Sequence, residues 1–128
     1  MNQRLGKSEK LKSKKVIEEL FTRGRSVKKY PVKLVYLPLS TTEENIPTKS
    51  GFSVPKKIVK TAVKRNRIKR LMREAFRKNK YLVAGPGYAF MFIYLSRDEI
   101  SQDEMNSKII TVLERFKQKE EGYEKAAD

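Results

Sequence analysis

The sequence predicts a small α+β protein in which three amphipathic helices pack on one sheet. Residues 32–37 (VKLVYL) alternate along the chain, as a strand does when its two faces meet different surroundings. Residues 88–95 (YAFMFIYL) are apolar at every position, which is typical of a central strand covered on both faces. Residues 105–116 carry apolar side chains at helical spacing. Strands, a helix, a strand and a final helix indicate a two-layer sandwich.

Local signals place the three helices. Ser13 is a candidate N-cap for the first helix, and Gly24 is expected to end it. The middle helix is predicted to span about residues 58–80. A capping box, SQDE from Ser101 to Glu104, begins the last helix.

A short strand at residues 50–55 (SGFSVP) lies between a polar loop at residues 40–49 and the middle helix. One face of this strand carries only Gly51 and Ser53. Such a bare face suits close packing against bulky neighbours, and it equally suits the floor of a groove. The sequence leaves both alternatives open.

The charge balance is strongly positive. Lys and Arg number 30 against 15 Asp and Glu, for a formal net charge of +15 over 128 residues. Excess charge of this kind opposes compaction and favours an anionic partner, with nucleic acid first and a membrane surface second. The length suits a single domain, residues 1–128. We expect a core of about residues 11–117, with residues 1–10 as a flexible basic arm and 119–128 as a frayed tail.

Absent residue types exclude several kinds of site. The chain has no cysteine and no histidine, so disulfides, thiolate zinc sites and Ser–His or Cys–His nucleophile pairs are ruled out. No apolar run approaches the ~20 residues that a membrane-spanning helix needs. We therefore expect a cytoplasmic protein.

The middle helix separates charge from apolar surface. On a helical wheel of residues 62–80 (AVKRNRIKRLMREAFRKNK), Ile68 and Met72 lie on the side opposite most of the arginines. Like charges at these spacings cost a few tenths of a kcal/mol per pair, and the phosphates of a nucleic acid would relieve that repulsion. The polar side, called the basic ridge below, consists of Asn66, Lys69, Arg70, Arg73 and Arg77.

Three functional hypotheses are open. The first, an RNA-binding subunit of a larger enzyme, rests on the family resemblance described in the next paragraph. The second is a ribosomal or general RNA-binding structural protein, which the same basic ridge fits. An independent nuclease is the third hypothesis. It is disfavoured because the adjacent acidic pairs suit solvation or helix capping better than a two-metal site. These pairs are Glu43–Glu44, Asp98–Glu99 and Asp103–Glu104.

The segment FSVPKK followed by AVKRNRIKRLMREAFR resembles the signature of the bacterial ribonuclease P protein family, and the similarity extends over about residues 11–117. The resemblance implies the order αβββαβα, as in domain 2 of ribosomal protein S5, with an additional strand near residues 26–30 and a left-handed crossover. It implies that an RNA subunit carries the catalytic centre and its Mg²⁺ ions. The protein then supplies no catalytic residue and binds no metal itself.

The resemblance also implies the partners and the residues that meet them. The partners are ribonuclease P RNA and the 5′ leader of precursor tRNA, with no membrane; the protein alone is expected to be a monomer. Ile17 stands where many family members have a second Phe, and the segment IVKTAV after Lys57 is one residue longer than usual and lacks a Gly. The implied RNA-binding residues are Lys56, Lys57, Arg65, Asn66, Arg67, Lys69, Arg70 and Arg73, and the implied leader-cleft residues are Ile17, Phe21, Tyr36 and Ser53.

Overall fold

The computed structural model describes residues 10–39, 48–83 and 87–127, with side chains described as far as residue 121. The expected arm before Lys10, most of the predicted polar loop and residues 84–86 lie outside these ranges. The elements are α1 (Lys14–Arg23), β1 (Arg25–Lys29), β2 (Val32–Pro38), β3 (Lys49–Ser53), α2 (Ala62–Asn79), a 3₁₀ turn η2 (Lys80–Val83), β4 (Tyr88–Tyr94) and α3 (Gln102–Ala127).

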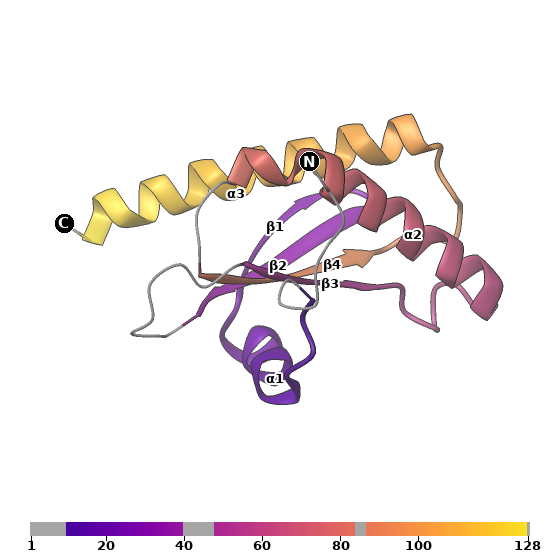
Figure 1. Cartoon of the computed structure of the whole chain (residues 1–128), viewed down its shortest axis with the longest axis horizontal. Helices are drawn as coiled ribbons and strands as arrows, with labels where there is room; N and C mark the ends of the chain where they lie inside the picture. The colour runs from indigo at the N-terminus through magenta and orange to yellow at the C-terminus, as the bar shows by residue number, and fades with distance from the viewer. Residues whose placement is uncertain (1–9, 40–47, 84–86, 128) are drawn as a thin grey trace.

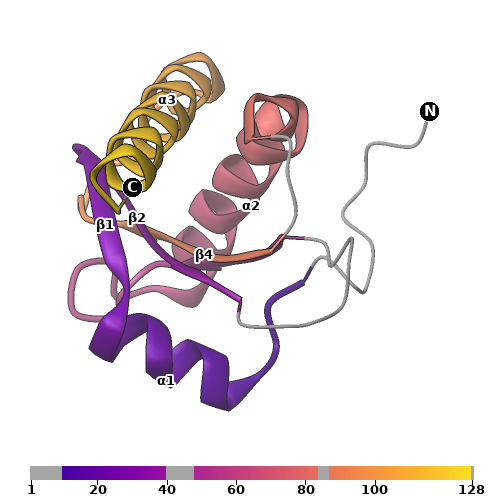
Figure 2. The same cartoon turned by 90° about the vertical axis from the view of Figure 1, so that its left-hand side faces the viewer.

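The four strands form one mixed sheet in the order β1-β2-β4-β3. β2 is antiparallel to both β1 and β4, whereas β3 and β4 are parallel neighbours connected through α2. Helices α2 and α3 lie over one face of the sheet, and α1 lies under the other (Figures 1 and 2). The predicted α+β class and the order αβββαβα are thereby confirmed, with α1 as a cover on the second face.

The main core lies between the sheet and the pair α2 and α3. Phe90 and Phe92 of β4 are buried there with Ile68 of α2 and Leu113 of α3. The ring of Phe52 on β3 stacks on Phe92, with 5.4 Å between ring centroids and 10° between planes. Burial of large aromatic and aliphatic side chains is the dominant favourable term in folding, so this layer fixes α2 against the sheet.

A smaller apolar cluster lies between the sheet and α1. Leu20 of α1 packs there with Val35, Ala89 and Met91, so β4 is covered on both faces as predicted. The nearly bare face of β3 belongs to this side. A Cβ at Gly51 would lie 3.1 Å from the Met91 Cε atom, which favours the packing alternative at this position.

Helix α1 begins and ends where the sequence predicts. The Ser13 side chain accepts a hydrogen bond from the Val16 N–H (3.3 Å), and the Gly24 N–H donates to the Leu20 carbonyl (3.0 Å). Gly24 is extended rather than left-handed. Close approach requires glycine here, because a Cβ would lie 2.2 Å from the Leu20 carbonyl oxygen and 2.9 Å from Val35 Cγ1.

The boundaries of α2 and α3 differ from prediction. α2 begins at Ala62 rather than near residue 58, because the Pro55 carbonyl accepts hydrogen bonds from the N–H groups of Ile58 and Val59 and closes a turn. α3 continues to Ala127, so the helix extends into the segment from residue 119 that was expected to be a tail. Although α3 has 26 residues, neither it nor another helix in the described ranges is apolar enough to cross a membrane.

Candidate RNA interface

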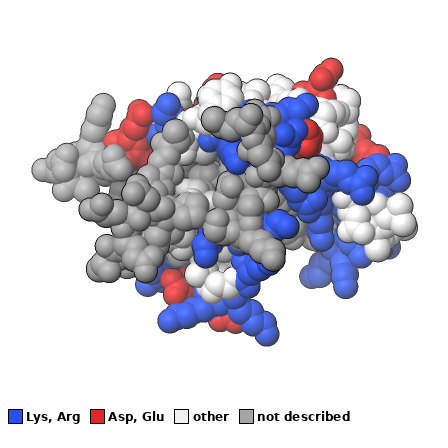
Figure 3. Space-filling view, in the orientation of Figure 1, with Lys and Arg blue, Asp and Glu red and all other residues white. Residues whose placement is uncertain are grey.

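The basic ridge lies on the outer face of α2. The inner face of the helix is fixed by Ile68 and Met72, which have no exposed surface. Asn66, Arg70 and Arg73 are exposed as a result, and the other two members of the ridge are half-buried. Figure 3 shows Lys and Arg side chains gathered over α2. Lys56 and Lys57 are exposed in the turn that precedes the helix.

The arginines near the start of α2 make contacts with other groups of the protein. The Arg65 Nη1 atom donates to the carbonyls of Val59 (3.0 Å) and Lys60 (2.9 Å). The Arg67 Nη1 atom lies 3.4 Å from the Glu99 carboxylate. These two arginines therefore tie α2 to the segments before and after it, which sequence reasoning did not predict.

The basic side chains in the middle of α2 have no acidic partner among the described residues. The side chains of Lys69 and Arg70 make no hydrogen bond or ion pair among the described residues, and the Arg73 guanidinium lies 5.8 Å from the Phe52 ring centroid. Arg77 differs because its Nε donates to Glu74 at 3.0 Å, and this hydrogen bonding lowers the pKa of the Glu74 carboxyl. The positive charge available to a partner is thus concentrated at Lys69, Arg70 and Arg73.

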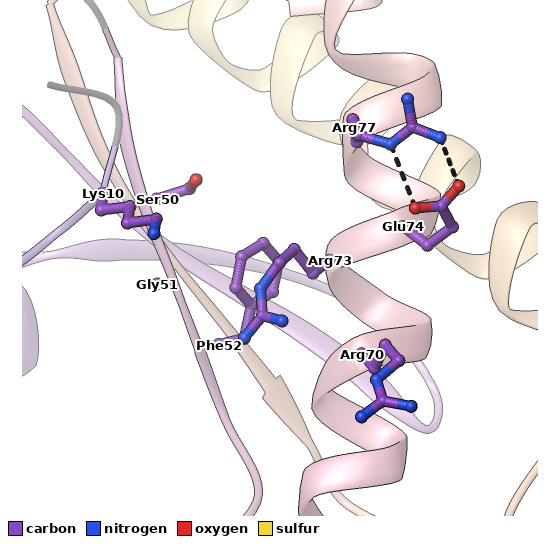
Figure 4. A pocket seen from close by; sticks show the side chains of 8 residues that line it. All are labelled: Lys10, Ser50, Gly51, Phe52, Arg70, Arg73, Glu74 and Arg77. Atoms are coloured by element: carbon purple, nitrogen blue, oxygen red, sulfur yellow. Dashed lines mark hydrogen bonds and ion pairs between the residues drawn. The ribbon is translucent and has the colours of Figure 1, made fainter. Parts of the chain in front are cut away.

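A pocket of about 770 Å³ opens between α2 and β3 (Figure 4). Arginines from α2 line one wall, and the end of the N-terminal segment and β3 line the other. The backbone of this segment is fixed to β3, because the Leu11 N–H donates to the Ser50 carbonyl at 2.9 Å. The lining residues are Lys10, Ser50, Gly51, Phe52, Arg70, Arg73, Glu74 and Arg77.

Residues expected in the leader cleft divide between the two faces of the sheet. Phe21 is 58% exposed on α1, and Ile17 packs with the cluster under α1. Tyr36 is fully buried on the opposite face, 4.7 Å from Phe116 between ring centroids. Its placement in a cleft beside α1 is therefore wrong, because side chains alternate along β2 and it is Val35 that faces α1.

Ser53 belongs to a row of side chains that crosses the sheet on the α1 side. Ser53 pairs with Ile93, Ile93 with Lys33, and Lys33 with Lys28. Directly opposed residues share a face, and Ile93 packs with the apolar cluster under α1. The two lysines add positive charge to the face that carries α1. Sequence reasoning missed them, although their place in the strand alternation was the available signal.

Two of the three adjacent acidic pairs lie in the described part of the chain, around the start of α3. Glu99 pairs with Arg67, and the Glu104 N–H donates a hydrogen bond to the Ser101 hydroxyl oxygen at the start of α3 (3.1 Å). Within the described ranges, no three Asp or Glu residues are grouped so that they could hold a metal ion. The pair Glu43–Glu44 lies outside these ranges.

Comparison with known proteins identifies the family. The family model for ribonuclease P matches residues 5–117. This chain belongs to the ribonuclease P protein family. The ribonuclease P protein component of Porphyromonas gingivalis is 42% identical over 79 residues, which cover 62% of this chain and 57% of that protein. The Chlorobaculum tepidum protein component is 35% identical over 123 residues, covering 88% and 75%.

Solved structures of ribonuclease P proteins share the fold. The Staphylococcus aureus protein has a TM-score of 0.69 at 22% identity, with 85% of this chain and 95% of that chain covered. The Thermotoga maritima protein has a TM-score of 0.69 at 21% identity, with 84% and 96% covered. The arrangement of helices around the mixed sheet is therefore that of this family.

Proposed function

We propose that this chain is the protein subunit of a ribonuclease P holoenzyme and that its basic ridge binds the catalytic RNA. The observation that carries the proposal is the unneutralised charge at Lys69, Arg70 and Arg73. This charge stands on a helix whose other face is fully buried. Phosphates would relieve the repulsion and release condensed counterions. Lys56 and Lys57 extend the positive surface beyond the start of α2.

We infer a second RNA surface on the α1 side of the sheet, which receives the 5′ leader of precursor tRNA. Phe21 offers an exposed ring on which a base can stack. The row that contains Ser53, Lys33 and Lys28 offers a hydroxyl and two positive charges for the backbone of a single strand. The ridge and this surface lie on opposite sides of the sheet (Figure 2), so one protein can contact both RNAs.

The proposed role is binding, and the RNA subunit supplies the chemistry. Mg²⁺ ions would be held by that RNA and would activate the attacking water and stabilise the leaving oxygen. This chain's own residues would raise the affinity for the leader-bearing substrate and neutralise phosphates near the cleavage site. Endonucleolytic removal of the leader, which gives the mature tRNA 5′ end, is then an activity of the assembly.

Reconstitution tests this function directly. The purified chain is combined with a bacterial ribonuclease P RNA and a precursor tRNA, at a Mg²⁺ concentration where the RNA alone is nearly inactive. We expect cleavage at the mature 5′ end only when both components are present. Tight RNA binding without stimulated cleavage would point to a ribosomal or other structural RNA partner. Cleavage by the protein alone would overturn the assignment of the chemistry to RNA.

The leader surface has its own test. Phe21→Ala should weaken the holoenzyme's binding of precursor tRNA several-fold, since base–aromatic stacking contributes about 1–3 kcal/mol per base. It should leave the binding of mature tRNA unchanged. Tyr81→Ala is a matched control, because Tyr81 is exposed to a similar degree (69%) on η2. Equal losses for both tRNAs would place the leader elsewhere.

A further inference from the structure

The pocket between α2 and β3 contains an unusual hydroxyl. Ser50 is only 3% exposed, and its Oγ atom is buried without a hydrogen-bond partner among the described residues. Buried polar groups in proteins are nearly always paired, so an unpaired one calls for an explanation. Ser50 lines the pocket, where its side chain lies on the wall facing α2 (Figure 4). A bound molecule with a polar group at this wall would satisfy it.

The charges around the pocket are unbalanced. Lys10, Arg70 and Arg73 line it together with one acid, Glu74. Glu74 is already engaged, because Arg77 binds its carboxylate through two hydrogen bonds. Arg70 has no such partner in the described part of the chain. The remaining charge favours an anion, and arginine forks are suited to phosphate oxygens.

The pocket also offers a flat surface. One side of the Phe52 ring packs on Phe92, and the Arg73 guanidinium lies over Phe52 at 5.8 Å from its centroid. Figure 4 shows the Arg73 side chain reaching from α2 toward the ring. A guanidinium plane supported in this way can stack on a nucleobase. The volume of about 770 Å³ falls within the roughly 300–1,000 Å³ of sites for small ligands.

We propose that this pocket binds a single nucleotide of the partner RNA, turned out of its strand. Its phosphate lies among Lys10, Arg70 and Arg73, and its base stacks on the Arg73 guanidinium. A ribose or base oxygen accepts a hydrogen bond from the Ser50 hydroxyl. The identity of the RNA rests on the proposed function, whereas recognition of a nucleotide by the pocket is testable without it.

The first test is a titration of the full chain with cytidine 5′-monophosphate, followed by NMR, with inorganic phosphate in parallel. We expect saturable shifts at β3 and α2 and weaker binding of phosphate alone. Ser50→Ala should weaken nucleotide binding about fivefold, as expected for one hydrogen bond, without affecting phosphate. Arg73→Gln should weaken both ligands. Ser107→Ala, at an exposed position on α3 away from the pocket, should change neither.

The outcomes separate the pocket from the proposed function. Equal binding of phosphate and nucleotide, or no effect of Ser50→Ala, would overturn nucleotide recognition. Because the Ser50 hydroxyl has no partner in the described part of the free protein, the alanine variant should melt at or above the wild-type temperature, so misfolding is checked directly.

A complex with ribonuclease P RNA should no longer bind the mononucleotide. Simultaneous binding of both would show that the pocket takes a free nucleotide instead. Failure of the chain to bind that RNA would overturn the proposed function and leave the pocket's nucleotide affinity standing.

Discussion

Two arginine sites in this protein have opposite surroundings. The Arg25 side chain on β1 is 28% exposed and lies 2.9 Å from the Glu120 carboxylate of α3, which is itself 9% exposed. Its guanidinium also lies 5.7 Å from the centroid of the buried Tyr36 ring. Arg70 on α2 is exposed, and its side chain makes neither a hydrogen bond nor an ion pair among the described residues.

The difference separates structural charge from charge that awaits a partner. Burial alone lowers the pKa of Arg25, but the Glu120 carboxylate raises it above its ordinary value and keeps the guanidinium ionised. A charge removed from water needs such a partner inside the protein. Arg70 stays in water and repels its neighbours on the basic ridge. Its placement gains free energy only when an external anion binds, which is why we assign it to function.

The largest expected effect is on the structural site. Glu120→Ala removes the ion-pair partner of the partly buried Arg25, and it removes the acceptor of the Tyr88 hydroxyl (2.6 Å). We expect a loss of about 2–3 kcal/mol in the free energy of unfolding, below the full range for a buried pair because Arg25 is partly exposed. Urea unfolding measures it. Glu121→Ala, at the neighbouring exposed position, should cost almost nothing. Affinity for ribonuclease P RNA should be unchanged in both variants. A large loss of RNA affinity in Glu120→Ala would show that the Arg25–Glu120 pair also affects RNA binding, contrary to the distinction drawn here.

Alkaline pH should weaken the same region. Burial, with the Glu120 charge, raises the pKa of Tyr36 from 10 to about 12. A raised folded-state pKa gives stability that is complete below pH 10 and is lost as the pH rises through about 12. Phenylalanine at this position cannot ionise. The unfolding free energy of Tyr36→Phe minus that of wild type should therefore rise by roughly 2 kcal/mol between pH 9 and 12. Urea unfolding at a series of pH values checks this, and parallel curves for the two proteins would contradict it.

The sequence predicted most of the fold because apolar periodicity is a local property. The central strand β4 and the helix cap at Ser13 were both predicted correctly from a few neighbouring residues. The end of α3 was not predicted correctly, because Glu120 lies in a polar stretch and is stabilised by Arg25 and Tyr88, which lie far away in the chain. The start of α2 was missed because Ile58 and Val59 extend its apolar pattern while forming a turn.

The candidate site was predictable to the level of the helix and no further. A helical wheel separates the basic ridge from the buried face, but it cannot show that Arg65 binds carbonyls while Arg70 binds none. Strand alternation groups Tyr36 with its own face but not with a particular helix. The pocket at Ser50 needs α2, β3 and Lys10 together, and no local pattern brings them together.

Arg65 combines the two roles that Arg25 and Arg70 show separately: it makes structural contacts within the protein, and it is one of the expected RNA-binding residues. Its hydrogen bonds to the Val59 and Lys60 carbonyls hold the turn before α2. Arg65→Ala should therefore lower the free energy of unfolding by about 1 kcal/mol and also weaken the binding of ribonuclease P RNA. Thermal unfolding and filter binding measure the two effects. If Arg65→Ala changed RNA affinity without changing stability, the carbonyl contacts would not be structural.

Arg70→Ala is expected to have the smallest effect on the free protein. It removes no hydrogen bond or ion pair among the described residues and relieves like-charge repulsion along α2, so the unfolding free energy should stay the same or rise slightly. In RNA binding, the loss of one phosphate contact should reduce the slope of log affinity against log salt by about 0.7–0.9. Lys108→Ala on α3 is a control that removes one charge away from the ridge. If both variants lowered the slope equally, net charge rather than the position of Arg70 would govern binding, and the contrast with Arg25 would concern stability alone.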